Sequence, residues 1–106
     1  MERAGIIASE VQVPRKDLAD FCSRNHIRKL SLFGSVLTGS FHANSDVDVL
    51  VEFDPEHIPG FFGLAGMESE LSEIFGRKVD LRTREDLSRY FRDEVVASAA
   101  VQYERS

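Results

Sequence analysis

The chain has 106 residues, of which 42% are hydrophobic and 29% are charged, as expected for one globular domain. With only 7 Gly and 3 Pro, it is neither a collagen-like nor a Pro/Gly-rich disordered chain. The 18 acidic and 13 basic side chains give a net charge of −5, and a broad nucleic-acid-binding surface is therefore not expected.

The first residues predict neither a regular element nor an export signal. Residues 1–12 show no firm hydrophobic periodicity, and their apolar run is too short for a signal peptide. We therefore expect a flexible arm over residues 1–12, one domain over residues 13–106, and a cytoplasmic protein with no membrane partner.

A helix and a strand are expected next. Pro14 suits the first position of a helix, which should end near residue 25. An apolar stripe at helical spacing supports this helix: Leu18, Phe21 and Cys22. Cys22 is the only cysteine, so we expect a buried free thiol rather than a disulfide. The segment from Ile27 to Phe33 predicts a strand.

The middle of the chain predicts a loop, a strand, a helix and a third strand. Residues 34–45 are rich in Gly, Ser, Thr and Asn and predict a loop with at most one helical turn. From residue 46 to residue 53, apolar side chains alternate with mostly acidic ones, which indicates a strand. Helical spacing over residues 64–75 predicts a helix capped by Gly76, and residues 79–82 predict a short strand.

The C-terminal part predicts a last helix. Thr83 and Asp86 resemble a capping box that opens a helix, with a break near Arg92. Beyond the break, four side chains are predicted to share one helical face: Val95, Val96, Ala99 and Tyr103. The order of elements predicts a small α/β (α+β) layer structure with a sheet of three or slightly more strands.

Three carboxylates are the strongest candidates for chemistry. Asp46 and Asp48 are two residues apart on a predicted strand, so both leave the same face, and a divalent cation would relieve their repulsion. An isolated Asp-Val-Asp is more often part of a solvated edge strand, so this motif alone is a weak signal. Asp80 would bring a third carboxylate to that face if its strand is the neighbour.

A candidate phosphate-binding loop follows the first strand. Gly34 permits close approach of the backbone to a ligand, Ser35 offers a hydroxyl, and Gly39 permits a second tight approach. Carboxylates that hold metal opposite such a loop suit the binding of a metal–nucleoside triphosphate.

Three motifs together closely resemble the minimal nucleotidyltransferase (MNT) family of the DNA polymerase β-like superfamily. They are Gly34-Ser35-Val36-Leu37-Thr38-Gly39, Ser45-Asp46-Val47-Asp48-Val49-Leu50-Val51 and Arg77-Lys78-Val79-Asp80-Leu81. The resemblance runs from about residue 14 to residue 103. It implies the polymerase-β-like nucleotidyltransferase fold, a small mixed sheet flanked by helices.

The resemblance also implies roles for individual residues. Asp46, Asp48 and Asp80 would be catalytic and would hold two Mg²⁺ ions, which Mn²⁺ could replace, with Asp80 as the base. The nucleotide would be bound by four residues: Gly34, Ser35, Gly39 and Ser45. One position departs from the family pattern, because many relatives have Arg where this chain has Thr38. Four side chains could supply the missing cation: Arg28, Lys29, His42 and Arg82.

The activity that the resemblance implies is antitoxic. MNT relatives are typically encoded beside HEPN-domain ribonuclease toxins, which implies transfer of AMP from ATP to a toxin tyrosine within a hetero-oligomer. Two alternatives remain: a binding-only antitoxin with weakened catalysis, and a nucleotidyltransferase that acts on a small molecule. Nucleic acid is not expected as a direct partner.

Overall fold

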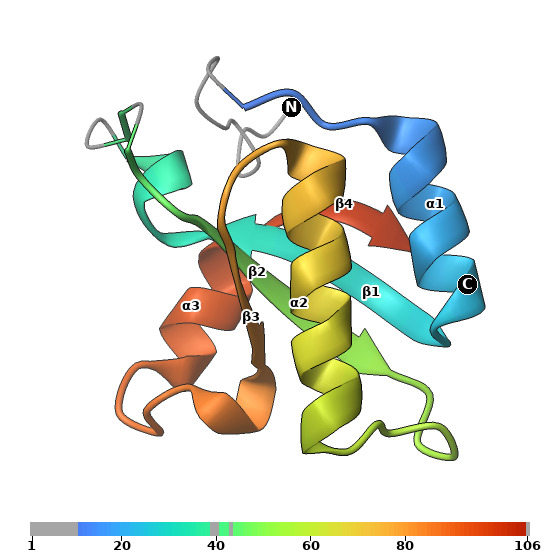
Figure 1. The fold of residues 1–106 in the computed structure, drawn as a ribbon. Coiled ribbons are helices and arrows are strands. Elements are labelled where there is room, and N and C mark those ends of the chain that lie inside the picture. Colours follow the sequence, from blue (N-terminus) through green and yellow to red (C-terminus); the bar gives the residue numbers. More distant parts are fainter. Residues whose placement is uncertain (1–10, 39–40, 43, 106) are drawn as a thin grey trace.

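The computed structural model describes residues 11–38, 41–42 and 44–105. The strands form one four-stranded sheet, and Figure 1 shows the helices around it. The helices are α1 (Arg15–Arg24), α2 (Phe61–Phe75) and α3 (Arg92–Ser98), with short 3-10 helices η1 (Gly34–Leu37) and η2 (Arg84–Asp86). The strands are β1 (Ile27–Phe33), β2 (Val47–Phe53), β3 (Val79–Thr83) and β4 (Ala100–Glu104).

The sheet is mixed, with the strand order β3-β2-β1-β4. Strand β1 is antiparallel to both β2 and β4, whereas β2 and β3 are parallel and joined through α2. The predicted fold class, a small mixed sheet flanked by helices, is confirmed. This topology brings the end of β1 and the starts of β2 and β3 to one edge of the molecule, while the start of β1 and the end of β2 lie at the opposite edge.

The core lies between the sheet and helices α1 and α2 (Figure 1). It includes the predicted stripe of α1, the alternate residues of β2 and one side chain of α2: Leu18, Phe21, Cys22, Val47, Val49, Val51 and Leu71. Cys22 is fully buried and free, as predicted, and burial raises the pKa of its thiol to about 12. Gly76 caps α2 with a left-handed φ of 67°, also as predicted.

The N-terminal arm falls largely outside the part of the chain that the structure describes. Residues 1–10 belong to the part not described, and Val11 is buried against the core. No helix among the described residues is long and apolar enough to span a membrane.

The predicted C-terminal helix is wrong in extent. The Thr83–Asp86 capping box is present, but it closes only the three-residue η2, and α3 starts at Arg92 and ends at Ser98. Residues 100–104 form β4 instead, so the four side chains predicted on one helical face do not share it: Val95 and Val96 lie in α3, Ala99 follows α3, and Tyr103 lies in β4. The free edge of β1 explains this outcome, because pairing with β4 satisfies backbone groups that a longer helix would leave open.

Candidate active site

Two of the three predicted carboxylates lie side by side. Asp48 and Asp80 are register partners on the parallel strands β2 and β3, and Asp46 precedes β2 by one residue. Strand β2 is an inner strand of the sheet, which excludes the alternative of a solvated edge strand. The prediction that the strand of Asp80 lies next to the strand of Asp48 is therefore confirmed.

Lys78 ties the carboxylates together. Its Nζ lies 3.7 Å from an Asp46 oxygen and 3.5 Å from an Asp80 oxygen. Asp80 and then Asp46 raise the pKa of Lys78, so the ammonium stays charged. One cation thus already contacts two of the three acids. Sequence reasoning did not single out Lys78, although its position two residues before Asp80 places both side chains on one face of the strand.

The three acids form a site that favours a cation. Burial, then the charges of Asp80 and Asp46, raise the pKa of Asp48, while Arg82 and Lys78 act in the opposite direction. The donor set is three carboxylates from adjacent chain segments, and hard oxygen ligands of this kind suit Mg²⁺ or Mn²⁺. The residues present therefore fit a divalent metal.

Gly34 is the point where the loop approaches the carboxylates. Its φ is 77°, and a Cβ at this position would clash with the carboxylate of Asp48, with 3.2 Å to Cγ. Only glycine therefore lets η1 start directly beside Asp48. Ser35 lies in η1, half-buried, and its carbonyl accepts hydrogen bonds from the Thr38 amide and hydroxyl, both at 3.1 Å. Gly39 lies outside the described residues.

Ser45 has a structural partner in the turn before β2. Its Oγ accepts a hydrogen bond of 2.9 Å from the His42 amide, and its own amide donates to the His42 carbonyl at 2.9 Å. Arg77 donates to the carbonyls of His42 and Ser45 and stacks over Phe41. Arg77 thus holds the turn that carries Asp46, a role that sequence reasoning missed. The predicted nucleotide contact of Ser45 stays a prediction.

The cations proposed to replace the family arginine at Thr38 differ in position. Arg28 and Lys29 lie at the start of β1, the end of the strand away from Gly34. Arg82 follows Asp80 by two residues on β3, and its positive charge opposes part of the rise in the pKa of Asp48. His42, the fourth candidate, lies in the turn before β2 and hydrogen-bonds to Ser45. Of the three basic side chains on the strands, Arg82 is the best placed for an anion bound at the carboxylates.

Comparisons with known proteins agree with this geometry. Residues 15–102 match the nucleotidyltransferase domain family. The chain is 33% identical over 81 residues to the protein adenylyltransferase MntA of Thermococcus cleftensis, which covers 76% of this chain and 77% of that protein.

Solved structures share the fold. A toxin–antitoxin structure with AMP-PNP superposes with a TM-score of 0.70 at 20% identity, covering 88% of this chain and 75% of the other. The complex of tri-AMPylated Shewanella oneidensis HEPN toxin with its MNT antitoxin gives a TM-score of 0.62 at 17% identity, covering 86% and 70%. The matched domain, the curated relative and the carboxylate edge agree, and the chain belongs to the nucleotidyltransferase domain family.

Proposed function

We propose that the chain is a Mg²⁺-dependent protein adenylyltransferase that transfers AMP from ATP to a tyrosine of a HEPN-domain toxin and so acts as its antitoxin. The observation that carries the proposal is the convergence of Asp46, Asp48 and Asp80 beside Gly34. The names of the relatives support the protein acceptor, the toxin partner and the nucleotide. A cytoplasmic location belongs to the same proposal.

Each residue has a defined task in this reaction. Asp46 and Asp48 would hold the metal, and Gly34 and Ser35 would lie against the triphosphate, with Gly39 and Ser45 completing the nucleotide site. Two Mg²⁺ ions, when bound, would neutralise the triphosphate and stabilise the leaving oxygen. Asp80 would take the proton of the tyrosine hydroxyl as its oxygen forms the bond to the α-phosphorus and the bond to pyrophosphate breaks.

Exposed aromatic side chains offer a surface for the toxin. Phe61 and Phe62 at the start of α2 are 79% and 86% exposed, and Tyr90 and Phe91 before α3 are 83% and 53% exposed. Large apolar side chains gathered on a surface are typical of protein interfaces. We therefore expect the toxin to contact one or both of these pairs.

Co-expression with the toxin of the neighbouring reading frame tests the proposal. With ATP and Mg²⁺, the wild type should leave the toxin heavier by one or more AMP units on tyrosine, by mass spectrometry, and unable to cleave RNA. Asp46→Asn/Asp48→Asn should leave it unmodified, whereas the control Glu52→Gln, further along the same face of β2, should modify it normally. An unmodified but neutralised toxin would contradict the enzymatic proposal.

A binding-only antitoxin is the second candidate, and Thr38 favours it. Its hydroxyl turns back to the Ser35 carbonyl, where many relatives would present a guanidinium to the phosphates. Neutralisation by the double variant at equal stoichiometry, without a change of mass, would support this candidate. Transfer of AMP to a hydroxylated small compound, with the toxin neither bound nor modified, would support the small-molecule alternative.

A further inference from the structure

A second group of metal-ligating side chains lies at the opposite end of strands β1 and β2 from the three carboxylates. His26, Asp54 and His57 each offer one donor atom, and these atoms lie within 4.8 Å of one another. Asp54 lies six positions beyond Asp48 in the sequence, which corresponds to about 20 Å along an extended chain. The two groups are therefore separate.

Backbone hydrogen bonds position all three residues. His26 precedes β1 and Asp54 follows β2, and the Asp54 amide donates to the His26 carbonyl at 3.0 Å. A tight turn then returns the chain, with the His57 amide donating to the Asp54 carbonyl at 2.9 Å. The group thus lies at the end of the β1–β2 pair away from the chain segment that joins the two strands, and backbone hydrogen bonds connect its members.

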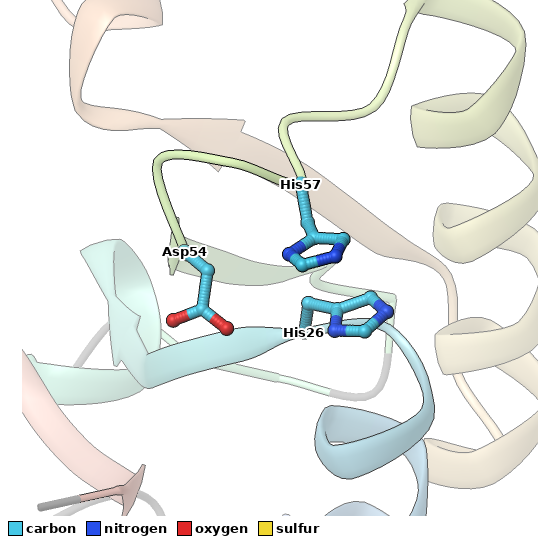
Figure 2. Close-up of side chains that lie close together, drawn as sticks. All are labelled: His26, Asp54 and His57. Carbon is cyan, nitrogen blue, oxygen red and sulfur yellow. The ribbon is translucent and has the colours of Figure 1, made fainter.

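The imidazole rings face each other at close range. Figure 2 shows the His57 ring over the His26 ring, with the Asp54 carboxylate beside them, and the ring centroids are 3.8 Å apart at an interplanar angle of 9°. His26 has a φ of 58°, the only positive φ at a non-glycine position in the described part of the chain. His26 follows Asn25, the C-cap of α1, where a left-handed residue commonly ends a helix, and this helix end sets the backbone from which the ring projects.

Asp54 is oriented by a cation. Arg105 donates a short hydrogen bond to Oδ1 of Asp54, which holds the pKa of this carboxyl below its usual range. An outer partner of this kind fixes the direction of a ligating carboxylate and leaves Oδ2 as a ligand. The Arg105 amide is itself held by the Arg28 carbonyl at 2.8 Å, so the outer partner also has a fixed backbone.

We propose that His26, Asp54 and His57 form a binding site for a transition-metal dication of the Zn²⁺ class. Two imidazole nitrogens and one carboxylate oxygen are a donor set that favours Zn²⁺ over Mg²⁺ and leaves a coordination position for water or an external ligand. Ligand atoms around tetrahedral Zn²⁺ lie roughly 3.3 Å apart, so the side chains must draw together slightly. Both histidines are exposed and can turn to do so.

Titration of the untagged, EDTA-treated protein with Zn²⁺ tests the site. We expect one Zn²⁺ per chain in the presence of excess Mg²⁺, a rise in melting temperature, and a Co²⁺ spectrum with tetrahedral d–d bands. His26→Asn and His57→Asn should each weaken binding by at least the roughly 10- to 100-fold that follows loss of an outer partner. Asn tolerates the left-handed backbone at residue 26, so that variant should remain folded.

Two controls separate this site from the others. His42→Asn removes the remaining histidine, and Asp46→Asn/Asp48→Asn removes the carboxylate edge, so both variants should bind Zn²⁺ as the wild type does. No saturable binding, binding that survives in His26→Asn and His57→Asn, or binding lost with His42→Asn or with the double variant would overturn the proposal. None of these outcomes depends on AMP transfer.

Discussion

Asp48 and Asp80 occupy the same register position on two parallel strands, and this pairing places two carboxylates side by side near the start of both strands. The burial of Asp48 and, after it, the charge of Asp80 raise the pKa of Asp48 and so disfavour its ionisation. Lys78 is largely exposed, so its positive charge offsets only part of the repulsion between these carboxylates. The folded protein is therefore less stable than it would be with neutral side chains at these positions. A bound cation would offset the repulsion and restore this stability.

Asp48→Asn should raise the melting temperature in metal-free buffer at neutral pH. Because the pKa of Asp48 is raised above its ordinary value of 3.8, its favourable contribution is present below that value and is lost as the pH rises through the folded-state pKa. The gain from the variant should therefore vanish in acid. Thermal melts from pH 3 to pH 8 check this, with Glu52→Gln as a control whose effect is small; a gain that persists at pH 3 would contradict it.

Gly34→Ala and Gly76→Ala form a matched pair, because both glycines have a positive φ but only Gly34 lies against another group. Gly76→Ala should cost about 1 to 2 kcal/mol of unfolding free energy and leave AMP transfer unchanged. Gly34→Ala should cost more and also abolish transfer, since its methyl group displaces the Asp48 carboxylate. Denaturant unfolding and a transfer assay measure both effects. Equal behaviour of the two variants would remove Gly34 from the site.

Local patterns predicted much of the fold. The alternation over residues 46–53, the apolar stripe of α1 and the Gly76 cap each depend on near neighbours in the chain, and each is confirmed. Strand β4 was missed because its partner β1 is about 70 residues away, and residues 95–103 fit a helical spacing almost as well.

Only part of the site could be predicted, again because sequence patterns reveal local features and not contacts between distant segments. Asp46, Asp48 and Asp80 stand in short motifs, whereas the roles of Lys78 and Arg77 depend on contacts with another strand and another turn. The His26–Asp54–His57 group leaves no motif at all, since the antiparallel pairing of β1 and β2 is what brings its members together.

Asp80→Asn should lower the rate of AMP transfer by roughly 10²- to 10⁴-fold, the usual contribution of a general base. Much of the ATP binding should remain, because Asp46 and Asp48 are intact. Single-turnover transfer to the toxin and equilibrium ATP binding separate these effects. Full transfer activity of Asp80→Asn would show that Asp80 has no part in the mechanism. Equal losses of ATP affinity and transfer rate would show that Asp80 only holds the metal and does not act as the base.

Lys78→Ala should tighten the binding of Mg²⁺ in the absence of nucleotide. The lysine contacts Asp46 and Asp80 and competes with a metal for the same oxygens. Lys16→Ala, an exposed lysine of α1, is the control for a change of net charge. Calorimetric titration with Mg²⁺ gives the affinities, and weaker binding in Lys78→Ala than in Lys16→Ala would contradict the competition.

Thr38→Arg should restore a phosphate contact. Thr38 is exposed at the end of η1, close in the chain to Gly34 and Ser35, and a guanidinium here could reach a triphosphate bound along the loop. A charge-assisted hydrogen bond contributes about 1.5 to 3 kcal/mol, so ATP should bind roughly 10- to 100-fold more tightly. Thr38→Gln has a long side chain without the charge and should give little of this gain. Unchanged affinity in Thr38→Arg would mean that another cation already contacts the triphosphate, and Arg82 is the best placed to do so. In that case Arg82→Ala in the wild-type background should weaken ATP binding. The control Arg28→Ala, at the far end of β1, should leave ATP binding unchanged.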